Sequence, residues 1–323
     1  MSKNLEIHPA QPPFHEGECA IQKRVGVREK LAKIGPLVIR DHMPDPHREF
    51  FAQLPWLIVG SVDASGQPWA SVLASPPGFV QTPDPRHLQV HASPLPTDPL
   101  SDTLASGAAI GLLGIEPQTR RRNRANGIVE QITRERFAVR VSQSFGNCPK
   151  YIQARTPVFV AGAGGTPRRG HRSATLDDAA RKMIARADTF FIATAYGGSA
   201  VAPAHGVDVS HRGGRPGFVR VDNDSTLTVP DFVGNFFFNT LGNIEINPRA
   251  GLLFVDFESG DLLYLAVAAA IVWDGEELAA FAGAQRLLRF RVIEARFVEA
   301  ALPLRWGAAE TSPFLESTGA WSR

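Results

Sequence analysis

The sequence contains little cysteine. Of its 323 residues only Cys19 and Cys148 are cysteines, and they lie far apart along the chain. Two distant cysteines provide neither a disulfide framework nor the paired ligand spacing of a zinc site. This usage suits a reducing compartment, so we expect a cytoplasmic protein.

Long hydrophobic runs are absent as well. The longest apolar stretch, Leu262 to Trp273, is bounded by Asp261 and Asp274, and it is shorter than the roughly 20 residues that a transmembrane helix needs. The N-terminal residues lack the apolar core of a signal peptide. We therefore expect no membrane segment.

An excess of charge of one sign is also missing. The chain has 34 basic and 32 acidic residues, with a formal net charge of +2. A balance this close argues against nucleic acid and membrane surfaces as partners. The hydrophobic content of 44% is enough to bury the cores of two domains of ordinary size.

The chain does have one distinctive stretch, from His205 to Phe257. Its apolar residues alternate on both sides of a glycine-rich turn, which predicts two half-buried strands. Asn235 is the expected start of a helix, and Asn247-Pro248 is its expected end. A buried strand is predicted from Ala250 to Phe257.

The turn and the helix start together predict an anion site. Arg212 supplies a fixed positive charge, while Gly213 and Gly214 allow backbone N–H groups to approach a ligand closely. The positive end of the helix expected at Asn235 would point to the same place. A phosphate group is the natural ligand of such a site.

Three segments in this stretch resemble the FMN-binding split barrel of proteins related to pyridoxamine 5'-phosphate oxidase. They are SHRGGRPGFVRV (210–221), TVPDFVGN (228–235) and NTLGNIEINPRAGLLF (239–254). The resemblance implies a mainly β fold in which FMN lies at the interface between two barrels. It identifies candidate cofactor-binding residues, which are Ser210, His211, Arg212 and Asn235 at the phosphate, with Gly213, Asp231, Gly234 and Asn239 beside them. Asp231 and Asn239 could equally cap or turn the backbone.

A basic cluster lies earlier in the chain, at Arg120, Arg121, Arg122 and Arg124. This segment resembles the family strand that runs beside the flavin ring. Alternation along a strand places Arg122 and Arg124 on one face. We expect these two near the flavin or an anionic substrate, because a cation favours the negative charge of a reduced flavin. A solvated surface strand is the alternative.

The order of elements repeats, which predicts two β-barrels in tandem. Gly217-Phe218-Val219 follows Gly78-Phe79-Val80 at an offset of 139, and Gly251-Leu252-Leu253 follows Gly111-Leu112-Leu113 at 140. The expected organisation is an N-terminal arm (1–42, helical from Ile21 to Ile34), a degenerate first barrel (43–154), an exposed linker (155–173) and a second barrel with the main FMN phosphate site (174–323).

The two copies are not equivalent. The first has Ala74-Ser75-Pro76-Pro77 where the second carries the Arg212-Gly213-Gly214 turn, and it has Asp98 near the position of Gly234-Asn235. A carboxylate there would repel phosphate. We therefore expect one FMN per chain, held mostly by the second barrel.

Other motifs in the chain are weaker. His205, Asp208 and His211 have a ligand-like spacing, but on an extended strand the two histidines would lie about 20 Å apart, so no metal site is expected. Gly162-Ala163-Gly164 imitates a dinucleotide fingerprint without its third glycine. The segment from Ser142 to Pro149 is distinctive but has no assigned role, and Cys148 is not expected to be a nucleophile.

The function that these features imply is that of an FMN-dependent oxidoreductase. It would transfer electrons or hydride between a reductant, with NADH or NADPH as candidates, and a small substrate that the sequence does not identify. The flavin performs this chemistry, so no catalytic side chain is assigned. A non-catalytic flavin or haem-type binding module and a ligand-free structural barrel are the alternatives. The chain would be a monomeric pseudo-dimer or a homodimer.

Overall fold

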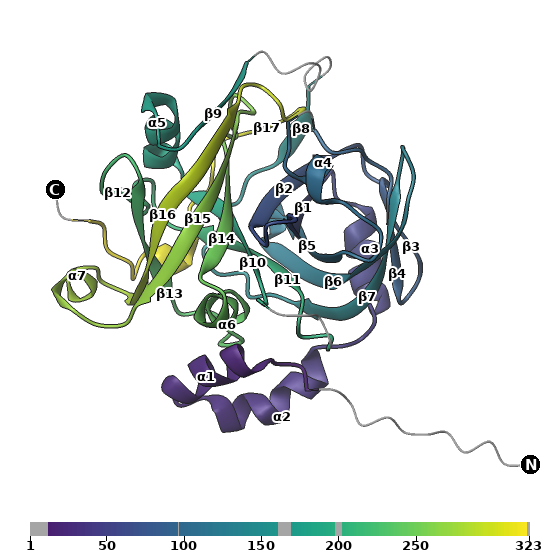
Figure 1. The fold of residues 1–323 in the computed structure, drawn as a ribbon, viewed down its shortest axis with the longest axis horizontal. Coiled ribbons are helices and arrows are strands. Elements are labelled where there is room, and N and C mark those ends of the chain that lie inside the picture. Colours follow the sequence, from purple (N-terminus) through teal and green to yellow (C-terminus); the bar gives the residue numbers. More distant parts are fainter. Residues whose placement is uncertain (1–11, 96, 161–168, 198–201, 322–323) are drawn as a thin grey trace, which may run out of the picture.

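A computed structural model describes residues 12–321, apart from residue 96 and the segments 161–168 and 198–201. The fold is mainly β, with antiparallel sheets and short helices (Figure 1). The strands of the first half are β1 (Trp56–Val62), β2 (Pro68–Ala74), β3 (Val80–Asp84), β4 (His87–Val90), β5 (Ala109–Glu116), β6 (Arg121–Ile132) and β7 (Phe137–Gly146). Those of the second are β8 (Pro157–Phe159), β9 (Gly170–Ser173), β10 (Thr189–Ala195), β11 (Val207–Gly213), β12 (Arg220–Val221), β13 (Thr226–Phe232), β14 (Arg249–Val255), β15 (Leu262–Val272), β16 (Ala284–Val298) and β17 (Leu304–Trp306).

The helices are α1 (Glu16–Arg24), α2 (Arg28–Val38), α3 (Asp45–Ala52), α4 (Leu100–Thr103), α5 (Asp178–Arg186), α6 (Asn239–Ile246) and α7 (Glu276–Ala279). Two short 3₁₀ turns lie at Pro117–Thr119 and Pro313–Leu315. Within the part of the chain that the structure describes, no helix is long and apolar enough to cross a membrane.

The two halves have the same strand order, which confirms the tandem repeat. The first sheet runs β2-β1-β5-β6-β7-β4-β3, and the second runs β11-β10-β14-β15-β16-β13-β12. Each strand of the first sheet therefore has one counterpart in the second, in the same position. Helix α4 precedes β5 as α6 precedes β14. The fold is thus two split barrels forming an internal pseudo-dimer.

Strand register fixes which residues correspond. Gly111 pairs with Gly60 and Gly251 pairs with Ala193, in agreement with the offset of 140. On the neighbouring strands Ser71 pairs with Val59 as Ser210 pairs with Ile192. Arg212, Gly213 and Gly214 therefore correspond to Leu73, Ala74 and Ser75, so the alignment of this turn with Ala74 to Pro77 was one residue out.

The two barrels touch through glycines on corresponding strands. A Cβ added at Gly111 would lie 2.5 Å from the carbonyl oxygen of Val207, and one at Gly251 would lie 2.4 Å from that of Pro68. Strand β5 thus packs on β11 of the other barrel, and β14 packs on β2. The shared core includes Trp56 and Tyr264, both fully buried. This pseudo-symmetric interface positions the site described below.

The N-terminal arm forms two helices instead of the single helix expected from Ile21 to Ile34. Gly26 has a positive φ of 75° and separates α1 from α2, because a left-handed residue ends a helix. In Figure 1 the two purple helices of the arm lie beneath the green helix α6. Helix α1 therefore covers the second barrel next to the interface.

The segment expected to be an exposed linker contributes two short strands. Strand β8 pairs with β17, and β9 pairs with β16. Trp306 of β17 packs edge-on against Trp56 of the first barrel, with ring centroids 5.0 Å apart. The glycine motif at 162–164 lies outside the described residues.

Candidate functional site

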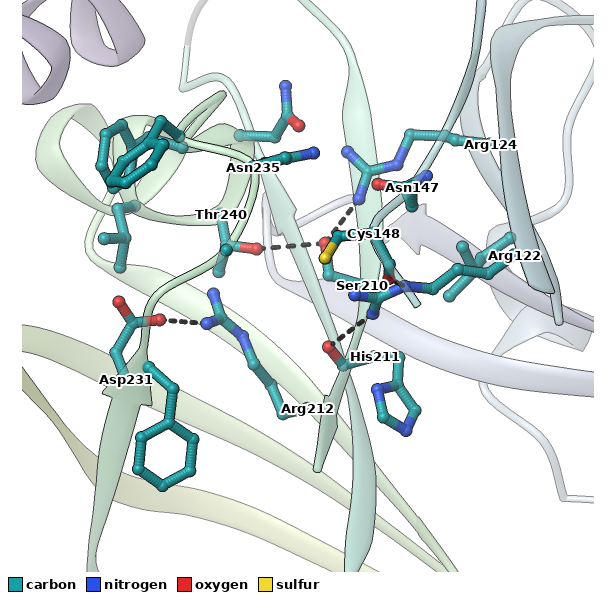
Figure 2. A pocket seen from close by; sticks show the side chains of 17 residues that line it. Arg122, Arg124, Asn147, Cys148, Ser210, His211, Arg212, Asp231, Asn235 and Thr240 are labelled. Atoms are coloured by element: carbon teal, nitrogen blue, oxygen red, sulfur yellow. Dashed lines mark hydrogen bonds and ion pairs between the residues drawn. The ribbon is translucent and has the colours of Figure 1, made fainter. Parts of the chain in front are cut away.

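A pocket lies between the two barrels, on the side of the interface where β6 faces β11 and the start of α6 (Figure 2). Its volume is about 100 Å³. Nine of the ten candidate cofactor residues line it, which are Arg122, Arg124, Ser210, His211, Arg212, Asp231, Gly234, Asn235 and Asn239. The tenth, Gly213, lines an adjoining pocket of about 70 Å³. The structure thus brings together residues that are up to about 120 positions apart in sequence.

The first barrel contributes Arg122 and Arg124, which lie on the same face of β6. Arg124 is 2% exposed and forms an ion pair with Asp208 across the barrel interface. It also donates to the backbone carbonyl of Val209 and the hydroxyl of Ser210. Because Asp208 also accepts from two asparagine side chains, the guanidinium of Arg124 is held rigidly at the pocket wall.

In the described part of the structure, Arg122 donates hydrogen bonds to backbone carbonyls only. Its Nε donates to the carbonyl oxygen of Cys148 at 2.6 Å, and its Nη1 donates to that of His211 at 3.3 Å. Desolvation lowers the pKa of Arg122 to about 10, so the side chain is still a cation near neutral pH. Its positive charge therefore contributes to the pocket without a paired carboxylate.

The second barrel contributes Arg212, which is paired with Asp231. Arg286 of β16 lies on the other oxygen of the same carboxylate, at 3.3 Å. One negative charge thus faces two arginines. Asp231 orients Arg212 and neutralises one of the two positive charges of Arg212 and Arg286. Its role in the site is therefore to hold the arginines.

The helix of the second barrel starts later than expected. Helix α6 begins at Asn239, not at Asn235, because the residues before it take left-handed conformations that a helix cannot include. Phe236 and Phe238 have φ values of 63° and 65°. The Asn235 side chain accepts from the N–H of Phe237. The free N–H groups of the helix start therefore belong to the turn that begins at Asn239.

His211 differs from its neighbours on β11. Successive residues of a strand face opposite ways, and the His211 imidazole packs edge-on against Phe191, with ring centroids 5.8 Å apart. Burial, followed by the nearby Arg122 and Arg212, holds its pKa well below the usual value. The side chain is therefore neutral and sits away from Ser210 and Arg212.

Several residues of the site were not identified from the sequence. Asn147 and Cys148 line the pocket from the segment after β7 that had no assigned role. Thr240, in the first turn of α6, also lines it and donates to the Ser210 hydroxyl at 3.2 Å. Their residue types were visible in the sequence, but only the fold places them beside Arg124. Among the described residues, no group of three or more His, Cys, Asp or Glu has the geometry of a metal site.

Donors exceed acceptors around the pocket. The Nε atoms of Arg124 and Arg212, Nδ2 of Asn147 and Nη1 of Arg286 are buried and make no hydrogen bond to any described residue. Buried donors without partners are rare, because each costs about 1 to 3 kcal/mol. A surplus of cationic and amide donors indicates a site for an anion.

In the first copy, the position that corresponds to this pocket is occupied by a side chain of the protein. By strand register Tyr264 corresponds to Arg124, and the offset of 140 relates Leu100 to Thr240. The fully buried Asp98 accepts from the Tyr264 hydroxyl and from the backbone N–H of Leu100, both at 2.8 Å. Its carboxylate thus takes the donors of this copy.

At the position of Asp98 the second barrel carries Phe238. The equivalence holds through α4 and α6, because Thr103 bonds to Ser61 as Asn243 bonds to Thr194. Residue 238 therefore provides no carboxylate in the second copy, where Arg124 is paired with Asp208 of β11 and the start of α6 has no acceptor from residue 238. An anion from solution would take the place that Asp98 has in the first.

No protein-family model matches this chain, and no curated protein matches it. It is similar to a solved structure of a putative pyridoxamine 5'-phosphate oxidase from Lactobacillus delbrueckii, at 16% identity and a TM-score of 0.30, over 38% of this chain and 94% of that one. HupZ from Group A Streptococcus (19%, TM-score 0.28, 36% and 89%) and HutZ, a heme storage protein from Vibrio cholerae (14%, TM-score 0.25, 37% and 91%), are others. Likeness at this level does not indicate which ligand this chain binds.

Proposed function

We propose that the chain binds FMN through its phosphate at the pocket between the barrels and works as a flavin-dependent oxidoreductase. The observation that carries the proposal is the contrast between Asp98 and Phe238. The first copy satisfies its donors with its own carboxylate, whereas the second leaves buried donors without acceptors. A phosphate supplies several acceptor oxygens and negative charge, which fits Arg124, Arg212 and the start of α6.

The residues present fit the phosphate end of FMN. Arg122, Arg124 and Arg212 would bind the anion, and Thr240 with Ser210 would orient it. The cavity of about 100 Å³ is below the usual 300 to 1,000 Å³ of small-molecule sites. The pocket would therefore hold the phosphate end of FMN, and the rest of the nucleotide would extend out of it.

The bound flavin would supply the electron and hydride chemistry. The chain's own residues would hold and orient it and tune its charge. Arg122, which has no carboxylate partner among the described residues, would favour a negatively charged ligand in the pocket. Neutral His211 lies on the other face of β11, so it would not serve as a cation in the pocket.

The first test is ligand content and affinity. Mass spectrometry of ligand released by heat, together with titration of the protein with FMN, should show binding. Arg212→Ala should weaken FMN more than riboflavin, since a charge-assisted phosphate contact is typically worth about 1.5 to 3 kcal/mol. Arg172→Ala, an exposed arginine on β9, is the control and should change neither. Equal losses for both ligands in Arg212→Ala would refute the phosphate assignment.

The second test separates an enzyme from a binding module. A flavin-loaded protein that is reduced under anaerobic conditions by NADH or NADPH supports an oxidoreductase. Loading with FMN that neither donor reduces, although dithionite reduces it chemically, would indicate a flavin-binding module instead.

A further inference from the structure

The wall of the pocket between β13 and α6 has an unfavourable backbone. Phe236 and Phe238 both line the pocket and both have positive φ values, of 63° and 65°. For residues with bulky side chains this conformation is a rare one that costs of order 1 to 3 kcal/mol, and it persists only where neighbouring contacts impose it. Something outside the wall must therefore hold it.

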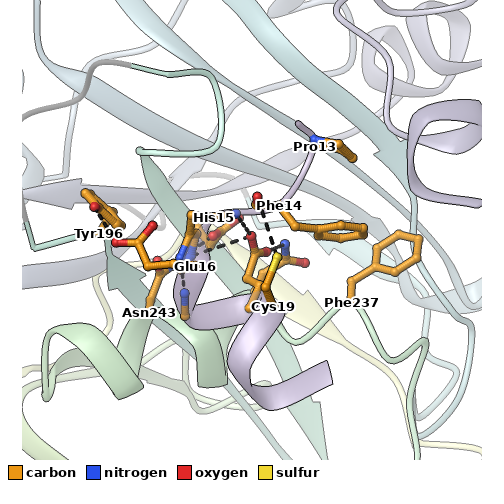
Figure 3. Close-up of polar contacts among 12 residues, drawn as sticks. Pro13, Phe14, His15, Glu16, Cys19, Tyr196, Phe237 and Asn243 are labelled. Carbon is orange, nitrogen blue, oxygen red and sulfur yellow. Dashed lines mark hydrogen bonds and ion pairs between the residues drawn. The ribbon is translucent and has the colours of Figure 1, made fainter. Parts of the chain in front are cut away.

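The N-terminal arm makes those contacts. The Glu18 carboxylate accepts from Nδ2 of Asn239, the first residue of α6, and Gln22 donates to the carbonyl oxygen of Phe237 at 3.2 Å. Both arm side chains are at least 98% buried. The ring of Phe14 packs edge-on against Phe237, with centroids 5.6 Å apart (Figure 3). Residues on either side of Phe238 are thus fixed from the arm.

The arm packs closely against α6, so these contacts are specific. A Cβ at Gly17 would lie 2.2 Å from the carbonyl oxygen of Gly242, and a Cβ at Gly242 would lie 2.5 Å from the backbone nitrogen of Glu18. Helices α1 and α6 therefore touch backbone to backbone. Only glycine at both positions permits this approach, so Glu18 lies directly beside the first turn of α6.

We propose that the N-terminal arm is part of the ligand site, with Glu18 and Gln22 as positioning residues that hold the wall from Phe236 to Asn239 in its binding conformation. This inference rests on the proposed function, because the ligand whose site the wall completes is the FMN phosphate. The contacts of the arm fix the start of α6 and the carbonyl of Phe237, so releasing them lets the wall relax to ordinary backbone conformations. The N–H groups of the helix start then lose their alignment toward the pocket.

The test uses the full chain and four variants. Glu18→Met keeps the volume of the side chain but removes the acceptor for Asn239, and Gln22→Met removes the donor to Phe237. Glu18→Gln retains one acceptor oxygen. Glu16→Met is the matched control, since Glu16 lies in the same turn of α1 and has the same side chain, but is exposed and bonds to Tyr196.

Two quantities are measured for each protein. Hydrogen exchange without ligand reports the order of residues 234–242, and titration with FMN reports affinity. Glu18→Met and Gln22→Met should each speed exchange in this segment and weaken FMN by up to about tenfold, as expected for the one hydrogen bond to the wall that each removes. The exchange rate and FMN affinity of Glu18→Gln should be closer to those of the unmodified chain, and those of Glu16→Met should equal them.

Several results would overturn the inference. Unchanged exchange and affinity in both methionine variants would do so, and so would faster exchange spread evenly over both barrels, which indicates a general loss of stability. Failure of the proposed function is distinguishable. If the unmodified chain binds no FMN, exchange in residues 234–242 still decides whether the arm positions the wall.

Discussion

Position 238 is where one residue decides whether the site is filled by the chain. Asp98 in the first copy accepts from Tyr264 and from the start of α4, whereas Phe238 in the second offers no acceptor to the start of α6, and Arg124 is paired with Asp208 instead. Asp tolerates the left-handed backbone that residue 238 has. An aspartate could therefore replace Phe238 in the second copy without a new backbone conformation.

Phe238→Asp should close the anion site. Its carboxylate would lie among arginines and compete with phosphate, so FMN affinity should fall at least about tenfold below that of Phe238→Asn. The asparagine variant is matched in shape and backbone preference but carries no charge. Fluorescence titration at fixed ionic strength measures both. Equal affinities in the two variants would show that charge at this position does not control the site.

Asp98 itself should make stability depend on pH. Burial raises its pKa from the ordinary 3.8 to about 6, so between these values the folded chain keeps a proton that the unfolded chain has released. The free energy of unfolding therefore falls as pH rises through this window, by up to about 3 kcal/mol. Asp98→Asn should flatten this dependence in denaturant unfolding at pH 4 and pH 6. Asp102→Asn, an exposed neighbour on α4, should not.

At the residue scale, site residues could be predicted from their amino-acid type and from their neighbours in the sequence. Arg212 and the arginines of β6 could be found because a fixed charge beside glycines, or several arginines in one strand, indicates an anion. Asp208 and Arg286 were not assigned to the site, because their roles come from contacts with strands far away in sequence. His211 was placed at the phosphate by motif, although alternation along β11 turns its ring toward Phe191.

At the level of elements, alternation and glycine turns predicted some strands of the second barrel, on both sides of the glycine-rich turn and after α6. The buried strand predicted from Ala250 to Phe257 is β14, which runs from Arg249 to Val255. The start of α6 was wrong by four residues, since left-handed phenylalanines have no sequence signature. The two-helix arm was also missed, because Gly26 was not read as a break.

The glycines between the barrels give a prediction for paired elements. Gly111→Ala would place a Cβ 2.5 Å from a backbone carbonyl of β11, which cannot be relieved by a side-chain rotation. We expect the free energy of unfolding to fall by about 1 to 3 kcal/mol, as for other overpacked interfaces. Gly307→Ala is the control, since nothing lies within 4 Å of its added Cβ. Chemical denaturation measures both, and equal midpoints would contradict close packing of β5 on β11.

For the whole molecule, the repeat provides two barrels, and among the described residues the pocket with the arginines is found on one side of their interface. The second barrel supplies Arg212 and the start of α6, and the first lends Arg122 and Arg124 from β6. Their counterparts on β15 are Leu262 and Tyr264, which belong to the buried core between the barrels. The duplicated fold could be predicted from spaced glycines. The division of roles depends on which copy carries arginines at these strand positions.

One ligand per chain is the consequence, and it can be counted. Because the site is built from both barrels, FMN should stabilise them together, by about 2.7 kcal/mol at a free concentration of 100 times Kd. Titration of dialysed protein should saturate at one FMN per chain, with both barrels gaining protection from hydrogen exchange. Phe238→Asp should move saturation to at least about tenfold higher FMN concentration, whereas Leu73→Ala, at the position that corresponds to Arg212, should leave the count unchanged. Two FMN per chain would contradict the asymmetry, because the second molecule would have to displace Asp98 from Tyr264.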